Sequence, residues 1–424
     1  MTQVARTLPH ASVDALHVGP TSSSAGHADG ISLSVSEDLA AVESDWRDFE
    51  RHADGTVFQT YRWLSTWQRC IGAFADVRPA IVIGRDGQNR LLFLLPLATQ
   101  PLRFGRELVW LGSDLCDYNG PLLAPHFTEM LGQTDFAAVW RRVVAALLAH
   151  PRLRFQVVRL QKMPDSIGAQ PNPMLRLPTM PHPSGAWLTS LADSWDAFYA
   201  AKRSSETRRR DRSKRKKLAA LGELKFVEPV DSAERLHTLD ILMQQKSRSF
   251  ARQGVRDLFA QPRHADFYRA LAADTECTEL VHISRLDVGD RPAAINLGLA
   301  FGRRYYHLLA SYSDDQDVAR FGPGAAHLND VMAHAIRRGF VVFDFTIGDE
   351  PYKANWCDTA QQLHDHIFAL TKGGWLVVVA IRTKQRLKRL IKQNALLWES
   401  YSKARIAFAR ISGPQAPSDP EDEP

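Results

Sequence analysis

The chain has 424 residues, of which 45% are hydrophobic and 24% are charged. This length suits two globular domains, and this composition excludes a disordered, fibrous or disulfide-stapled protein. The net charge of +6 is unevenly distributed, because ten Lys/Arg and two acids lie between Lys202 and Lys217. That segment carries a net charge of +8, and the rest of the chain carries a net charge of −2. What this one segment contacts therefore bears on function.

The four cysteines are isolated from one another, and none belongs to a C-x-x-C pair. This spacing argues for free thiols in a reducing compartment and against a zinc ribbon, so we expect no metal. The longest strongly apolar stretch, Trp375 to Ile381, is far short of the ~20 residues that span a bilayer. The first thirty residues contain no apolar run of secretory length. We therefore expect a cytoplasmic protein, with peripheral membrane contact left open.

The first half of the chain predicts a tail, a domain and a linker. Residues 1–30 are rich in Ser, Ala, His and Gly and predict a disordered tail. Residues 31–163 predict a first domain, with a polar turn at 114–121 after an apolar strand. Its predicted strands are 31–35, 78–84, 91–100, 107–111 and 155–160, and its predicted helices are 37–52 and 136–150. A run of prolines predicts a linker over 164–185.

The second half predicts another α/β domain over 186–375. Tight turns at Gly289-Asp290 and Gly302-Arg303 join three strands into an antiparallel meander. The predicted strands are 186–190, 224–229, 279–286, 293–301, 305–312, 341–346 and 361–371, and the predicted helices are 194–221, 232–252, 264–275 and 325–338. A basic helix at about 384–410, within 376–412, and a disordered acidic tail at 413–424 close the chain.

A loop with two glycines precedes the predicted helix at 325–338. It reads Arg320-Phe-Gly-Pro-Gly-Ala. Glycines let the backbone approach a ligand closely, and the start of a helix offers unpaired N–H groups and partial positive charge. Together these features suit a pyrophosphate. An ordinary strand-to-helix turn would look similar, and Pro323 removes one donor. The meander before the loop and the polar strand end after the helix favour the anion site.

The polar strand end carries a resemblance. The chain reads Pro323-Gly324 before the helix and Asp344-Phe-Thr-Ile-Gly-Asp-Glu-Pro-Tyr-Lys-Ala-Asn-Trp356 after it. This pattern resembles the acyl-CoA site of GNAT acetyltransferases, above all the branch grouped with the cellulose-biosynthesis protein CelD, which is related to the FemAB peptidyltransferases. The resemblance covers roughly residues 31–375. It implies an α/β (α+β) fold of tandem GNAT-like domains, with mixed, mostly antiparallel sheets flanked by helices.

The resemblance also implies the parts of a site in the second domain. The strands near 305–312 and 341–346 would splay and expose main-chain groups to the pantetheine arm of acetyl-CoA or another acyl-CoA. The cofactor-binding residues it implies are Arg320, Phe321, Gly322, Gly324 and Ala325. The wider GNAT signature has its Gln/Arg one residue further from the first glycine than Arg320 lies from Gly322. The main chain is therefore expected to hold the diphosphate.

Direct acyl transfer needs a base for the acceptor and an acid for the leaving thiolate. Glu350 is the first candidate for the base and Asp349 the second, while Tyr352 would protonate the thiolate. Backbone amides would polarise the thioester carbonyl. The alternative is that the polar residues of this loop only anchor it to the sheet.

Four further residues are predicted to bind the acceptor. Lys353 and Trp356 close the motif, and Asp117 and Tyr118 belong to the polar turn of the first domain. The alternative for the turn is that its Asp and Asn side chains bond to their own backbone.

The predicted function is transfer of an acetyl or other acyl group from acyl-CoA to an amine or hydroxyl of a small-molecule or saccharide acceptor, in polysaccharide or envelope biosynthesis. One alternative is a FemAB-like transferase that uses aminoacyl-tRNA, and another is a non-catalytic GNAT-fold binding protein. The basic segment is either a solvated helix face, a phosphate contact or a nucleic-acid contact. It has no base-reading motif and no interleaved aromatic residues, so nucleic acid is not favoured.

Overall fold

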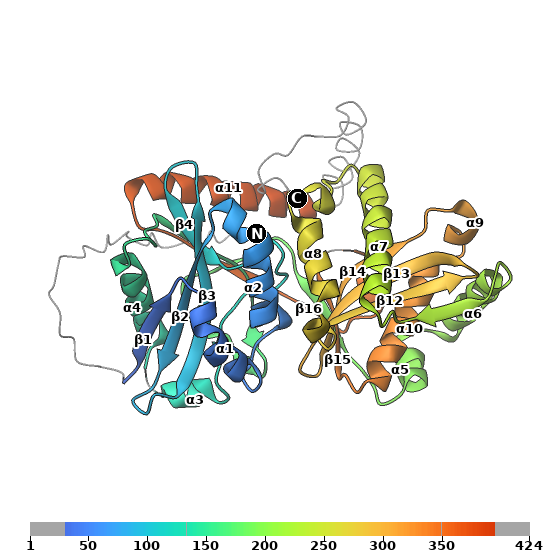
Figure 1. The fold of residues 1–424 in the computed structure, drawn as a ribbon, viewed down its shortest axis with the longest axis horizontal. Coiled ribbons are helices and arrows are strands. Elements are labelled where there is room, and N and C mark those ends of the chain that lie inside the picture. The colour runs from blue at the N-terminus through green and yellow to red at the C-terminus, as the bar shows by residue number, and fades with distance from the viewer. Residues whose placement is uncertain (1–29, 133, 349, 395–424) are drawn as a thin grey trace, which may run out of the picture.

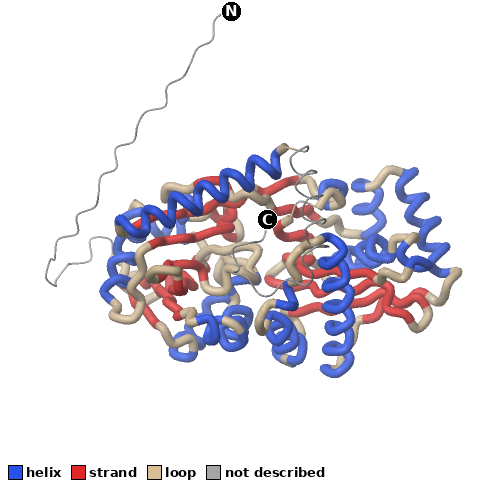
Figure 2. Tube along the Cα trace, turned by 90° about the horizontal axis from the view of Figure 1, so that it is seen from above, coloured by secondary structure: helices blue, strands red, loops and turns tan. Residues whose placement is uncertain are grey.

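The computed structural model describes residues 30–132, 134–348 and 350–394, which form two α/β units lying side by side (Figure 1). Each unit has a mixed, mostly antiparallel sheet. Figure 2 shows from above the helices that flank the strands. The fold class expected from the sequence is therefore confirmed. The described residues contain no helix that is both long and apolar enough to cross a bilayer.

The first sheet has the order β1-β2-β3-β4-β6-β17-β9, with β5 beside β3. Its strands are β1 (Ser32–Ser36), β2 (Arg78–Arg85), β3 (Leu91–Pro101), β4 (Arg106–Trp110), β5 (Leu122–Leu123), β6 (Val157–Pro164), β9 (Met180–Pro181) and β17 (Leu363–Ala369). The helices of this unit are α1 (Glu43–Glu50), α2 (Tyr61–Cys70), α3 (Phe127–Leu131), α4 (Phe136–Ala149) and α11 (Lys372–Gln393). Strand β3 reads as a near-continuous apolar run because both of its faces are covered.

The second sheet has the order β11-β12-β13-β14-β15-β10-β16. Its strands are β10 (Ala186–Ser190), β11 (Leu224–Val227), β12 (Val281–Val288), β13 (Arg291–Phe301), β14 (Arg304–Tyr312), β15 (Val342–Ile347) and β16 (Thr359–Gln361). Its helices are α5 (Trp195–Lys202), α6 (Ser205–Ala219), α7 (Ser232–Gln253), α8 (His264–Ala273), α9 (Gln316–Ala319) and α10 (Pro323–Arg337). Helices α7 and α8 pack on one face of this sheet, and α10 packs on the other.

The two units share one continuous apolar core. Trp63 of α2 meets Phe267 of α8 with ring centroids 4.9 Å apart, and Phe58 meets Tyr306 of β14 at 5.8 Å. All four side chains are at most 1% exposed. Burial of aromatic side chains dominates core energetics, so the relative position of the two units is set by packing rather than by a linker.

The structure differs from the sequence-based expectation in four predicted segments, and it adds α2, α3 and β5, which were not predicted. Residues 164–185, expected as a linker, include β9, which pairs with β17, and the short strands β7 (Ser166–Ile167) and β8 (Gln170–Pro171). Strand β17, expected in the second domain, pairs with β6 and completes the first sheet instead. The helix predicted over 194–221 is two helices, because Ser204 caps a new one by accepting from the amide of Thr207.

The fourth difference is the start of the closing helix. It begins at Lys372 rather than near 384, because Thr371 caps it by accepting from the amide of Gly374. The rest of that prediction, to 410, lies outside the described residues, as do the two predicted tails apart from residue 30.

Candidate active site

Strands β14 and β15 run parallel but stay together for only a short distance. They pair at Arg304–Val342, Tyr305–Phe343 and Tyr306–Asp344, and then diverge. A register shift between Leu297 and Gly298 bends β14 against β13 just beyond that point. The backbone groups of the diverging strand ends are therefore free of sheet pairing with each other, as the resemblance implies.

Helix α10 begins where β14 leads out of this opening. Gly322 precedes the helix in the left-handed region, with φ of 67°, which favours glycine. The amides of Ala325 and Ala326 both point back to the carbonyl of Gly322, at 3.1 and 3.2 Å. A side chain at Gly324 would meet the ring of Tyr312, the last residue of β14, at 3.3 Å. The absence of a side chain at this position thus leaves the opening between the ends of β14 and β15 unobstructed.

The basic helix α6 lies against this helix start. Arg215 forms an ion pair with Asp330 of α10 at 2.9 Å, which fixes the two helices together. The ammonium of Lys214 reaches within 3.9 Å of the position that a Cβ on Gly322 would take, and that of Lys217 lies 5.8 Å from the Phe321 ring centroid. The positive charge of α6 therefore adds to the partial charge of the α10 N-terminus.

Of the predicted cofactor residues, Arg320 alone carries a charge. Its guanidinium pairs with Asp317 one helical turn earlier, at 3.3 Å, and lies 4.9 Å from the Phe321 ring centroid. Its side chain is 58% exposed. Lys214 and Lys217 were not among the residues predicted from the sequence, because a run of basic residues does not show which of them faces a ligand.

The end of β15 is strained, and the loop that follows it is held by an ion pair. Thr346 has φ of 59°, which is uncommon for a β-branched residue, and its amide donates to the Asp344 carboxylate at 2.7 Å. Lys353 is 3% exposed and donates to the carbonyl of Ile347 at 3.0 Å and to Glu350 at 2.8 Å. Gly348 has φ of 140°, which strains any residue other than glycine, and a Cβ there would also press on the ion pair, 2.7 Å from Lys353 Nζ.

Glu350 and Tyr352 differ in protonation. Burial opposes ionisation of Glu350, but the Lys353 ammonium outweighs it and the pKa is lowered. Tyr352 is 40% exposed, and burial of its hydroxyl together with the charge of Glu350 raises its pKa. At neutral pH the loop therefore offers one carboxylate and one protonated phenol. Asp349 lies outside the described residues.

Trp356 is 5% exposed and packs on α5. Its ring is stacked on Phe198 at a centroid distance of 6.1 Å, and the Arg203 guanidinium lies 4.9 Å above it. Lys353 and Trp356, which were predicted to bind the acceptor, thus hold the loop and the α5 helix against the sheet.

The polar turn of the first unit does reach the end of β15. The Tyr118 hydroxyl donates to Asp344 at 2.7 Å, and both side chains are at most 1% exposed. Burial raises the pKa of Asp117, while Lys162 and a hydrogen bond with Thr346 oppose this rise. Asp117 is partly exposed and Tyr118 is sealed in the core between the units, so of these two predicted residues only Asp117 can meet a ligand.

Two titratable side chains near this loop carried no signal in the sequence. Burial lowers the pKa of Lys246 on α7, and Glu350 and Lys353 are the charges that act on it. Burial also lowers the pKa of His307 to about 3, and its ring lies between Phe343 and Phe345 at 5.8 and 5.9 Å. His307 is therefore neutral at physiological pH, next to the point where the strands part.

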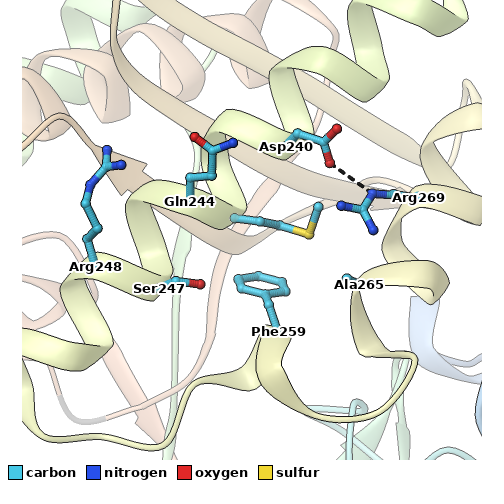
Figure 3. A pocket seen from close by; sticks show the side chains of 8 residues that line it. Asp240, Gln244, Ser247, Arg248, Phe259, Ala265 and Arg269 are labelled. Atoms are coloured by element: carbon cyan, nitrogen blue, oxygen red, sulfur yellow. Dashed lines mark hydrogen bonds and ion pairs between the residues drawn. The ribbon is translucent and has the colours of Figure 1, made fainter. Parts of the chain in front are cut away.

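A pocket of about 480 Å³ lies between α7 and α8 (Figure 3). An ion pair between Asp240 and Arg269, at 2.9 Å, crosses one side of it. Met243 and Phe259 supply its apolar lining. None of the residues predicted for the site lines this pocket.

Among the described residues, Glu228, His282 and His334 bring three metal-ligand side chains together. The carboxylate lies 3.1 Å from His282 Nε2 and 3.2 Å from His334 Nδ1. The two imidazole rings are stacked at 4.3 Å with only 8° between their planes. Ring-nitrogen lone pairs lie in the ring plane, so two parallel rings cannot both direct them at one ion. This arrangement fits a carboxylate that accepts one hydrogen bond, from His282.

Comparisons with known proteins bear on the family and the fold. Residues 205–354 match the family model described as an acetyltransferase (GNAT) domain, which spans β11 to β15 and the start of α10 between them. The match covers roughly a third of the chain. No curated protein sequence matches this chain significantly.

Solved structures match over most of the chain. FemX is 12% identical with a TM-score of 0.52, over 77% of this chain and 96% of that one. A conserved protein of unknown function from Bacteroides thetaiotaomicron is 9% identical with a TM-score of 0.48, over 79% and 99%. A tandem GNAT protein from the clavulanic acid biosynthesis pathway is 11% identical with a TM-score of 0.43, over 80% and 99%. At these identities the similarity to FemX establishes the fold alone.

Proposed function

We propose that this protein is an acyltransferase that moves an acetyl or other acyl group from acyl-CoA to an amine or hydroxyl of a small-molecule or saccharide acceptor. The observation that carries the proposal is the short pairing of β14 with β15, with helix α10 starting at the opening. A role in polysaccharide or envelope biosynthesis and membership of the CelD-like branch are part of the proposal and rest on the motif from Asp344 to Trp356.

In this proposal the pantetheine arm lies between the diverging strands and the diphosphate lies at the start of α10. Gly322 and Gly324 admit the diphosphate closely, and Lys214 supplies a charge-assisted contact from α6. The adenosine phosphate would then meet the exposed cations of α6. This assigns the basic segment to phosphate binding rather than to a merely solvated face.

Glu350 is proposed to take the proton of the attacking acceptor, either directly or through water. Its lowered pKa keeps it ionised at neutral pH, so the carboxylate form that accepts a proton predominates, although it is a weak base. Tyr352 is proposed to donate a proton to the thiolate, since its raised pKa keeps the phenol protonated. Asp349 stays the second candidate for the base, and Asp117 is proposed to orient the acceptor from the first unit.

Calorimetric titration with acetyl-CoA tests the proposal. We expect wild-type protein to bind, and Gly324→Asp to weaken binding by about tenfold or more, because two negative charges near 4 Å repel by roughly 1–4 kcal/mol. An acid is well tolerated in the first turn of a helix, so this change should not unfold the protein. Ala233→Asp, in the exposed first turn of α7, is the matched control and should bind normally.

A second candidate function is transfer from aminoacyl-tRNA, as in the FemAB-like proteins. The similarity in fold to FemX and the exposed cations Arg209, Arg210 and Arg212 of α6 support it. Salt-sensitive tRNA binding without acetyl-CoA binding would replace the first proposal with this one. Binding of neither ligand would leave a GNAT-fold protein without transferase activity.

A further inference from the structure

Helix α11 has a buried face that docks it on the first unit. Val378 is 4% exposed and packs with Val157 of β6 and Ile367 of β17. Arg382 donates to the carbonyl of Ile367 at 2.9 Å, and Gln385 donates to Asp365 at 2.8 Å. The helix therefore keeps one fixed orientation along the edge of the molecule (Figure 1).

The opposite face of α11 presents a row of apolar side chains to solvent. At 3.6 residues per turn, Leu376, Val379, Leu387 and Leu390 fall on one stripe that points away from Val378. Their exposed fractions are 65%, 40%, 58% and 61%. Thr383 also falls on this stripe, with its hydroxyl donating to the Val379 carbonyl at 2.9 Å. Exposed apolar side chains gathered on one helix face in this way mark a contact with a partner or a membrane.

The same helix is strongly and purely basic. It contains seven Lys/Arg and no Asp or Glu: Lys372, Arg382, Lys384, Arg386, Lys388, Arg389 and Lys392. Position 386 lies on one flank of the apolar stripe and position 384 on the other. An apolar stripe bordered by cations is typical of helices that lie in the interface of a bilayer.

A second, separate segment adds an aromatic side chain to this surface. Phe104, at the tip of the hairpin between β3 and β4, is 75% exposed, with the Arg103 guanidinium 5.6 Å from its ring centroid. Leu102 of the same hairpin packs against the docked side of α11, so the tip lies beside the helix (Figure 1). Trp375, near the start of α11, is 57% exposed. Tryptophan and phenylalanine are common anchors at the headgroup level.

We propose that this surface, formed by the outer face of α11 and the tip at Phe104, binds the surface of an anionic lipid bilayer. The helix lies parallel to the membrane, with Leu376, Leu387 and Leu390 at the acyl boundary and the flanking cations at the headgroups. Charge complementarity selects this occupant, because the sequence of the helix carries seven Lys/Arg and no acid, and Arg386 and Lys384 border the apolar stripe, which suits anionic headgroups above an apolar layer. This inference does not depend on the proposed transferase activity.

Co-sedimentation of the full chain with vesicles tests it. We expect binding to vesicles of phosphatidylcholine with 30% phosphatidylglycerol, weaker binding in high salt, and little binding to phosphatidylcholine alone. Leu387→Gln combined with Leu390→Gln should lower partitioning at least tenfold, because two leucines no longer enter the apolar layer. Arg386→Gln should lower it roughly fivefold.

Matched controls separate this surface from general basicity and general hydrophobicity. Arg212→Gln removes an exposed cation from the other basic helix, α6, and Val230→Gln removes a side chain that is 88% exposed in the second unit. Both should partition within twofold of wild type. Circular dichroism should show the same melting for all variants, since only exposed side chains change.

Three results would overturn the proposal. They are absence of binding to anionic vesicles, binding that the two leucine changes leave untouched, and equal loss with Arg212→Gln. If the leucine changes instead abolish a concentration-dependent dimer while vesicle binding is absent, the surface contacts another copy of the chain. If the full chain neither binds vesicles nor dimerises, another part of the protein covers the outer face of α11.

Discussion

Tyr118→Phe tests the contact by which the first unit holds the strained strand end of the second. The change keeps the ring, which packs on Phe58 at 5.8 Å, and removes only the hydroxyl that donates to Asp344 at 2.7 Å. A hydrogen bond to a charged group contributes about 1.5–3 kcal/mol. Asp344 retains Arg304 and the amide of Thr346, so we expect the free energy of unfolding to fall by about 2 kcal/mol.

The loss in free energy of unfolding that Tyr118→Phe causes should depend on pH in a defined direction. Burial raises the pKa of Asp344, while Arg304 and then the Tyr118 hydroxyl oppose that rise. Loss of the hydroxyl therefore raises the folded-state pKa further. A carboxyl with a raised pKa binds its proton more tightly in the folded state, so stability is lost as pH rises from the unfolded value of 3.8 through the folded pKa. The variant should thus be more impaired at pH 8 than at pH 5.

Urea denaturation followed by tryptophan fluorescence at both pH values measures this effect. Tyr312→Phe is the control, because it makes the same chemical change at a ring that is 51% exposed. We expect that control to change the free energy of unfolding by less than about 0.5 kcal/mol. If Tyr118→Phe is no less stable than Tyr312→Phe at pH 8, the hydrogen bond does not stabilise the fold as reasoned.

Gly348→Ala should lower turnover at least tenfold while acetyl-CoA binding is retained, because a Cβ there collides with the ion pair of Glu350. Gly87→Ala is the control, because a Cβ at that position meets open space. Equal activity of the two variants would contradict the geometry. Glu350→Gln and Tyr352→Phe should each lower turnover by roughly 10²–10⁴ with calorimetric acetyl-CoA binding intact, and full activity in both would remove the assignment. Because the pKa of Glu350 is lowered below 4.5, the pH profile of kcat/KM should show no inflection from this base between pH 6 and 8. If wild type shows an inflection in that range that Glu350→Gln lacks, this protonation state is refuted. Burial lowers the pKa of His327 to about 3, so its folded form stays neutral and the stability it contributes is lost as pH falls below 6.5. In urea denaturation, the free energy of unfolding of His327→Gln should therefore fall by roughly 2 kcal/mol less than that of wild type between pH 7 and pH 5. An equal fall in both proteins would show that this histidine is not responsible.

Elements with a local signal were predicted well. The apolar runs in 78–84 and 91–100, the turn at Gly289-Asp290 and the apolar stripe of 136–150 correspond to β2, β3, the β12–β13 hairpin and α4. The glycines at 322 and 324 were placed at a helix start, where the structure has them. These features depend on side-chain period, turn chemistry and caps, all of which lie within a few residues of one another.

Features that depend on distant partners were not predictable. Nothing in the sequence of β17 shows that it pairs with β6, about 200 residues earlier, rather than with the sheet it follows. The proline-rich stretch 164–185 looked like a linker, but Met174 is fully buried against the first sheet. Lys214 is one of ten similar cations in sequence, and the packing of α6 beside α10, with its Arg215–Asp330 ion pair, places it near Gly322.

The sequence by itself determined the fold class, the order of most strands and helices, and the two motifs that border the opening between β14 and β15. Local backbone preferences and hydrophobic periodicity suffice for these features. Only the tertiary structure decided that Tyr118 is sealed against Asp344, that Lys246 and His307 approach the loop, and that α11 keeps an apolar face outward. Burial and the pairing of charges across the chain decide those properties, and neither can be read from neighbouring residues.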